Sequence, residues 1–258
     1  MSSLNDSLEK ITILEVLIVL LAFIGILILL GFFGFSIDED WIYVGVIIYF
    51  IYRLRFFGDE FVHDLKNIFS KMSPKSLITI VLVNVFFSYG MLYLSILLLD
   101  HFPWLKSLIL MSAVPLVVVN SFADVGSLIS VIVVSPICEE LLFRGVFLNR
   151  LKLLVPTSFA IVITSLLFGA LHSYGNVISA CIFGVCMCII YLKTRNILTC
   201  ILAHFINNLL AEFIVHIDSG NLIFTNDIFI FLFSILAIVS FYLIVISIRK
   251  EWKYINKR

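Results

Sequence analysis

The stretch SPICEELLFRGVFLNR, from Ser135 to Arg150, places three charged side chains within six residues, at 139–144, in apolar surroundings. Glu139 and Glu140 are adjacent, and Arg144 follows four residues after Glu140. Leu, Ile, Val and Phe dominate on both sides, so the segment is predicted to lie within a membrane. An ionisable side chain at bilayer depth costs about 2.5–3.5 kcal/mol on insertion scales and usually marks a functional interior. The stretch therefore predicts a site inside a membrane protein.

Helical geometry gives the three charged residues different partners. If the stretch is helical, Glu140 and Arg144 stand on one face, where an ion pair offsets part of the cost of burial. Glu139 lies about 100° around the helix from Glu140 and needs a second partner. A simpler interpretation is an ion pair that fixes the helix register, with a spare glutamate near the water interface. The choice depends on the other polar residues in the membrane.

Composition predicts the fold class. The 258 residues are 62% hydrophobic, and the mean hydropathy is +1.17. We expect an all-α polytopic membrane bundle of about eight transmembrane helices of roughly 20 residues each, forming a single domain over residues 1–258. The run 108–119 is too short to cross and is expected to be re-entrant or interfacial. The expected spans are 11–34, 41–52, 77–99, 127–149, 157–172, 176–192, 196–216 and 228–248.

Charge placement predicts the orientation. Basic and acidic residues balance at 17 each. With a cytoplasmic N-terminus, nearly all Lys and Arg residues fall on the cytoplasmic side, whereas the outer loops hold Lys106 and several acids. This bias predicts that both termini are cytoplasmic and that the number of spans is even. The basic loop 53–76 also carries acids, so it is interpreted as a solvated connector with an amphipathic helix around 60–72, and no nucleic-acid partner is expected.

The five cysteines all fall in predicted spans. Their number is odd and no CxxC pair is present, so a disulfide framework is not expected. They are interpreted as small core residues. Cys138 precedes Glu139, but a thiol nucleophile there would need a nearby base and some exposure.

Two histidines lie deep in apolar segments. His172 ends the run SLLFGALH, and His204 lies in TCILAHFINNLLAEF, with Asn207 beside Asn208 one turn later. Polar side chains in membrane helices usually face the bundle interior and find partners. His172 taken alone could be a core residue whose ring is hydrogen-bonded within the bundle. That interpretation is weaker for His204, because two asparagines follow it within one turn. Together with the glutamates, these residues supply a base, a proton shuttle and oxyanion donors for amide hydrolysis by water. No nucleophile elbow and no HExxH pair is present.

At these residues the chain resembles a known family. EELLFR at 139–144 matches the EExxxR motif, FGALH at 168–172 the FxxxH motif, and HFINN at 204–208 the HxxxN motif of the CAAX-protease and bacteriocin-processing (CPBP, or Abi) family of membrane proteases. The three motifs occur in the family's order within a motif core at 135–210, on an eight-span frame that is typical of the family.

The resemblance implies roles for six residues. Glu140 would polarise the attacking water with help from His172, whereas His204 and Asn208 would stabilise the oxyanion. Glu139 and Arg144 would brace the site, and the division of labour between the two glutamates is open. No cofactor is expected in the preferred mechanism, because Asn208 rather than a carboxylate is the near neighbour of His204. The alternative is zinc, held by Glu140, His172 and His204 with one position open.

The predicted function is that of an intramembrane endopeptidase in a bacterial cytoplasmic membrane. Its partners would be the bilayer and a hydrophobic or leader-bearing peptide, with roles in bacteriocin maturation, immunity or peptide signalling. The alternative is a non-catalytic immunity or scaffold protein that binds and regulates a partner. A proton-coupled transporter would also use buried Glu and His, but it is expected to show inverted repeats or matched broken helices. The site residues are expected to converge between the fourth, fifth and seventh spans.

Overall fold

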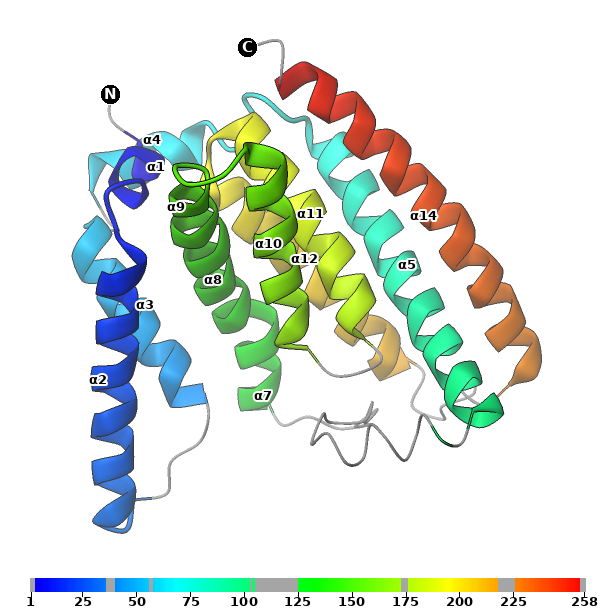
Figure 1. Cartoon of the computed structure of the whole chain (residues 1–258), viewed down its shortest axis with the longest axis horizontal. Coiled ribbons are helices and arrows are strands. Elements are labelled where there is room, and N and C mark those ends of the chain that lie inside the picture. Colours follow the sequence, from blue (N-terminus) through cyan, green and yellow to red (C-terminus); the bar gives the residue numbers. More distant parts are fainter. Residues whose placement is uncertain are drawn as a thin grey trace.

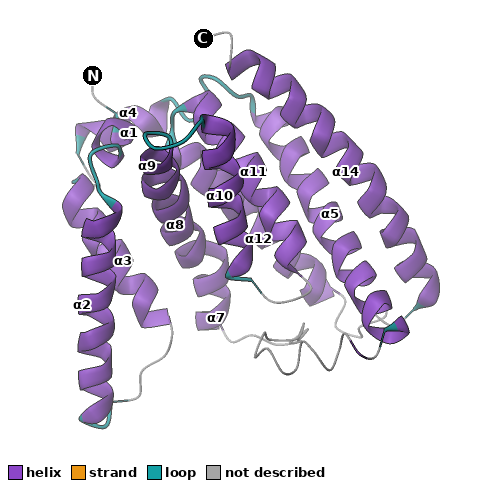
Figure 2. Ribbon diagram, viewed as in Figure 1, coloured by secondary structure: helices purple, strands orange, loops and turns teal. Residues whose placement is uncertain are grey.

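The computed structural model describes residues 3–35, 40–55, 58–102, 104, 125–172, 176–217 and 226–255, and every regular element in these ranges is a helix (Figures 1 and 2). The predicted all-α membrane bundle is confirmed. The helices are α1 (Leu4–Leu8), α2 (Ile13–Phe32), α3 (Asp40–Leu54), α4 (Asp59–Lys66), α5 (Pro74–His101), α10 (Thr157–Ala170), α11 (Val177–Thr194), α12 (Ile197–Ile217), α14 (Asp227–Ile255) and a composite helix over 125–151.

The composite helix combines two kinds of turn. It runs through α7 (Val125–Ile129), α8 (Ser135–Glu140) and α9 (Asn149–Leu151), and two π-helical segments join these parts. The π segments are η1 (Ser130–Val134) and η2 (Leu141–Leu148). The fourth expected span is therefore one helix with two locally wider turns.

Six helices in the described ranges are long and apolar enough to cross a membrane, so the protein is a multi-pass membrane protein. A seventh span results if α3 and α4 count together, although the chain bends by 102° between them. Helix α10 has only 14 residues, because it ends at Ala170 and begins after Pro156. The expected number of eight crossings is thus not confirmed, and the expected re-entrant run 108–119 lies outside the described residues.

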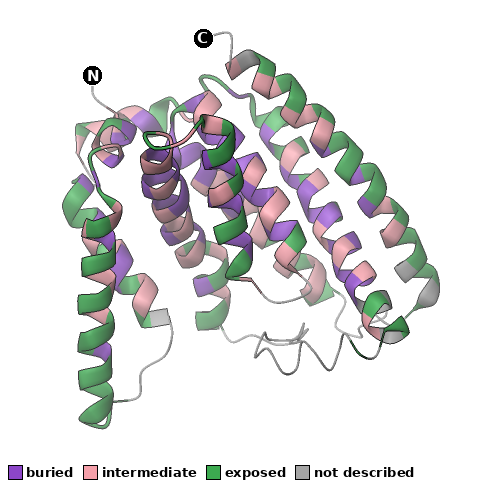
Figure 3. Ribbon diagram, in the orientation of Figure 1, coloured by how far each residue is buried: buried purple, intermediate pink, exposed green. Residues whose placement is uncertain are grey.

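The site-bearing helices occupy the middle of the bundle. Helices α2 and α3 form a hairpin at one side, α5 and α14 pack along each other at the other, and the composite helix, α10, α11 and α12 lie between them (Figure 1). Buried residues concentrate in this central group, whereas α2 and α14 are largely exposed (Figure 3). The exposed residues of α2 and α14 are mostly apolar, which suits contact with lipid.

An N-terminal cap, residues 3–11, closes the end of the bundle at which α4 and the C-terminal end of α14 also lie (Figure 1). Leu4, Leu8 and Ile11 have no exposed surface. Polar contacts fix the cap from several elements: the backbone N–H of Leu4 donates to Asp64 Oδ2 over 3.0 Å, Arg195 pairs with Glu9 over 2.8 Å, Arg150 Nε donates to the carbonyl of Ile11 over 2.5 Å, and the Tyr191 hydroxyl donates to Asn5 Oδ1. The amphipathic helix expected around 60–72 is the shorter α4.

Candidate active site

The two glutamates lie at the end of α8, between the two π segments. Here the backbone N–H of Ser135 donates to the carbonyl of Ser130, five residues earlier. π-helical turns are rare and occur frequently at functional sites, because the extra residue turns neighbouring side chains toward a different direction. The composite helix thus presents Glu139 and Glu140 from a locally unusual backbone.

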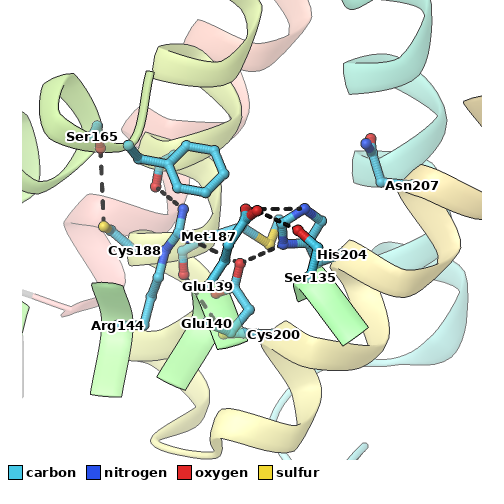
Figure 4. Close-up of polar contacts among 12 residues, drawn as sticks. Ser135, Glu139, Glu140, Arg144, Ser165, Met187, Cys188, Cys200, His204 and Asn207 are labelled. Atoms are coloured by element: carbon cyan, nitrogen blue, oxygen red, sulfur yellow. Dashed lines mark hydrogen bonds and ion pairs between the residues drawn. The ribbon is translucent and has the colours of Figure 1, made fainter. Parts of the chain in front are cut away.

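Glu140 and Arg144 form the ion pair that their spacing predicts. Arg144 Nη1 donates to Glu140 Oε1 over 2.9 Å, and both side chains have no exposed surface (Figure 4). Arg144 Nη2 also donates to the carbonyl of Gly184 in α11 over 3.2 Å, and its Cζ lies 4.6 Å from the centre of the Phe168 ring. Carboxylate, carbonyl and aromatic face together compensate a buried guanidinium charge.

His204 joins α12 to both glutamates. Its Nδ1 lies 2.8 Å from Glu140 Oε1, and its Nε2 lies 3.9 Å from Glu139 Oε2 (Figure 4). A carboxylate oxygen only accepts hydrogen bonds, so Nδ1 carries a proton and donates it to Glu140. The 3.9 Å gap is too long for a direct hydrogen bond, but two polar atoms at this separation can share one water molecule.

Glu139 is held differently from Glu140. The hydroxyl of Ser135, one turn earlier, donates to Glu139 Oε1, whereas Glu139 Oε2 has no hydrogen-bond partner. The Glu139 side chain keeps 18% of its surface exposed, compared with none for Glu140. Ser135 is therefore the second partner that Glu139 required. It was not among the predicted site residues, although its position four residues before Glu139 is a signal of such a contact.

His172 lies just beyond the end of α10. Its Nδ1 donates to the carbonyl of Phe168 over 2.9 Å, which leaves Nε2 with the lone pair. The Phe168 ring centre lies 4.8 Å from the His172 ring and 6.0 Å from the His204 ring. The two histidines therefore border the same aromatic ring, and His172 joins the site through it.

The two asparagines of α12 lie beside this cluster. Asn208 Nδ2 donates to the carbonyl of Val131 in η1 over 2.9 Å, and Asn207 Nδ2 donates to Asn208 Oδ1 over 3.3 Å. Figure 4 shows Asn207 apart from the carboxylates. Among the six predicted site residues, Glu139, Glu140, Arg144 and His204 thus form the central cluster, and His172 and Asn208 border it.

The zinc alternative requires Glu140, His172 and His204 to point at a common centre. In the part of the chain that the structure describes, no group of three His, Cys, Asp or Glu side chains is placed to hold a metal ion. Glu140 Oε1 and His204 Nδ1 bond to each other, and His172 Nδ1 bonds to Phe168. The arrangement therefore does not fit the tetrahedral ligand set of a zinc site.

The fold and the site define a class: a multi-pass helical membrane protein with a buried cluster of carboxylates, imidazole and guanidinium. Residues 120–210 match the family model described as type II CAAX prenyl endopeptidase Rce1-like. This match confirms the resemblance to the CAAX-protease (CPBP) family over the segment that carries all six predicted site residues. Comparison with curated proteins and with solved structures found no match.

Proposed function

We propose that the protein is a CAAX-protease-like intramembrane endopeptidase that hydrolyses a peptide bond with an activated water molecule. The observation that carries this proposal is the contact of His204 with both glutamates inside the bundle. A base, a polarising imidazole and a compensating guanidinium are the groups that peptide hydrolysis by water needs. The family match over 120–210 supports the same reaction class.

The geometry favours Glu139 as the base, in place of the role that the resemblance implied for Glu140. Glu140 Oε1 already accepts hydrogen bonds from Arg144 and His204, and the side chain is fully buried. Each glutamate has one oxygen without a partner, Glu139 Oε2 and Glu140 Oε2, but only the Glu139 side chain keeps exposed surface. A base must reach its water directly or through one further water molecule, and the partly exposed Glu139 side chain meets that condition better than the fully buried Glu140 side chain. Glu140 and Arg144 would then hold His204 in place.

The proposed reaction uses the gap between Glu139 and His204. Glu139 takes a proton from the water as its oxygen attacks the scissile carbonyl carbon. The carbonyl oxygen becomes an oxyanion, which His204 stabilises by donating from Nε2–H while Nδ1–H keeps its bond to Glu140; this step requires a proton on both ring nitrogens. The carbon–nitrogen bond then breaks, and Glu139 returns the proton to the leaving amine. His172, with its lone pair on Nε2, assists the proton transfer.

We propose that no metal takes part, because Glu140 and His204 are committed to each other. We propose as substrate a hydrophobic or leader-bearing peptide of the kind processed in bacteriocin maturation, immunity or peptide signalling, in a bacterial cytoplasmic membrane with both termini inside. The position of the site in the middle of an apolar bundle supports a substrate that enters from the bilayer.

The test is proteolysis of a tagged panel of the host's small peptides by the purified protein and by Glu139→Gln. The substitution keeps the shape of the side chain and removes the proton acceptor, so turnover should fall by roughly 10²–10⁴. Glu212→Gln is the matched control, because Glu212 is a partly buried glutamate of α12 outside the cluster. Full activity in Glu139→Gln would overturn this base, and peptide binding without cleavage by the wild type would support the scaffold alternative.

A further inference from the structure

The composite helix has a gap in its backbone hydrogen bonds just before the glutamates. In η1 the N–H of Ser135 donates to the carbonyl of Ser130, five residues earlier. The next bond in this pattern would run from residue 136 to the carbonyl of Val131. Residue 136 is proline, which has no N–H. The Val131 carbonyl therefore lacks the donor that a continued π-helical pattern would supply.

The side chain of Asn208 supplies a donor at this place. Its Nδ2 lies 2.9 Å from the Val131 oxygen, across 77 residues of sequence. Asn207 Nδ2 donates to Asn208 Oδ1, which orients the amide with its nitrogen toward Val131. Inside a bilayer, a backbone carbonyl must find its partner within the protein, because water is not available there.

We propose that Asn208 is a positioning residue that replaces the backbone donor missing at Pro136 and thereby holds the glutamate-bearing helix against α12. The catalytic part of this inference rests on the proposed function. Two side-chain hydrogen bonds join α12 to the composite helix, Asn208 to the Val131 carbonyl and His204 to Glu140, from residues one turn apart on α12. Together, these two bonds constrain the tilt and the depth of α12 against the composite helix. They thereby also constrain the 3.9 Å separation between His204 Nε2 and Glu139 Oε2.

This role differs from the oxyanion contact that the resemblance implied for Asn208. Loss of an oxyanion donor lowers the rate by ~10²–10³, and misplacement of catalytic groups by about 1 Å lowers it by ~10². Asn208→Ala alone therefore does not distinguish the two roles. Restoring the backbone donor does, because an added N–H at position 136 can replace a positioning amide but cannot replace a contact with the substrate.

The experiment is a double-mutant cycle of Pro136→Ala and Asn208→Ala, with kcat, KM and the thermal unfolding midpoint in detergent measured for all four proteins. We expect Asn208→Ala to lower kcat by ~10² and to lower the midpoint, with little change in KM. In the Pro136→Ala background the same substitution should lose most of both effects. Asn84→Ala is the control: Asn84 Nδ2 donates to the carbonyl of Ile80 over 2.9 Å in α5, so its cost should be equal in both backgrounds.

Each outcome decides the inference. Equal effects of Asn208→Ala on the midpoint in both backgrounds would overturn the role in the helix. Recovery of the midpoint without recovery of kcat would overturn the positioning role in catalysis and would favour direct contact with the substrate. If the wild type cleaves no peptide, the proposed function fails, and the unfolding midpoints still decide whether Asn208 replaces the missing donor.

Discussion

Glu140 and Arg144 place two opposite charges where neither has any exposed surface. A buried ion pair adds little net stability, because removing both charges from water costs about as much as their attraction returns. Removing one partner is different, since it leaves the other charge buried and unpaired. The pair therefore constrains the site even though it need not stabilise the fold.

We expect Glu140→Gln to destabilise the protein by about 3–5 kcal/mol, because the Arg144 guanidinium loses its carboxylate. Glu140→Gln combined with Arg144→Met should recover much of this loss, since the pair is then replaced by uncharged groups. Thermal unfolding in detergent measures both variants. A Glu140→Gln protein as stable as the wild type would show that the ion pair is not needed to hold Arg144.

At the scale of elements, close helix packing depends on small residues. A Cβ added at Gly90 in α5 would lie 2.4 Å from the Ala237 Cβ and 2.5 Å from the carbonyl oxygen of Phe233, both in α14. Neither atom is the end of a flexible side chain, so the two helices would have to move apart. Glycine at this position permits α5 and α14 to pack along each other, as small residues commonly do in membranes.

We expect Gly90→Ala to lower the free energy of unfolding by about 1–3 kcal/mol through overpacking. The control is Gly25→Ala in α2, where an added Cβ meets nothing within 4 Å. There alanine should be neutral or stabilising by up to about 1 kcal/mol, because it favours the helix. Equal responses of the two variants would contradict the close contact of α5 with α14.

The elements also show which parts of the fold the sequence could predict. The apolar runs located the long helices in the described ranges, because hydropathy reports length and composition, but not the short α1. The expected span 157–172 nearly coincides with α10, Thr157–Ala170, but a helix of 14 residues is too short to count as a span. The apolar runs also did not predict the π segments around α8, because those depend on contacts with other helices rather than on local spacing.

The candidate site divides in the same way. The contact of Glu140 with Arg144 follows from a spacing of four residues, and the sequence predicted it. The bonds of His204 to Glu140 and of Asn208 to Val131 join segments 64 and 77 residues apart, so their geometry depends on how α12 crosses the composite helix. Motifs indicated that these residues share a site, but not which glutamate each one contacts.

At the scale of the whole molecule, the N-terminal cap and α4 join the elements at one end of the bundle. Asp64 in α4 is central there: it accepts the backbone N–H of Leu4 over 3.0 Å, and its own carbonyl accepts Asn196 Nδ2 over 2.7 Å. Burial raises the pKa of the Asp64 carboxyl above its ordinary value, although hydrogen bonds from His63 and Leu4 act in the opposite direction.

This raised pKa predicts a pH dependence of stability. The folded protein holds the Asp64 proton more tightly than the unfolded chain does. The stabilising contribution is therefore fully present below the unfolded value of about 3.9 and is lost as pH rises through the folded pKa. The unfolding midpoint of the wild type should fall as pH rises from about pH 4, near the ordinary pKa of Asp, to about pH 8. This fall should be less steep in Asp64→Asn than in the wild type. Identical slopes would exclude Asp64 as the source.

The contacts of the N-terminal cap form at different times during translation, because their partners lie far apart in the sequence. Glu9 is translated 186 residues before its partner Arg195. At about 5–20 residues per second, that interval lasts roughly 10–40 s. During it, α3, α4 and η2, the elements that contact α1, are synthesised first, and the polar partners Tyr191 and Arg195 come last. Completion of the polar contacts of the cap is therefore a late event that reports the arrival of α11, and a ribosome that stalls before Tyr191 leaves Asn5 and Glu9 without these partners.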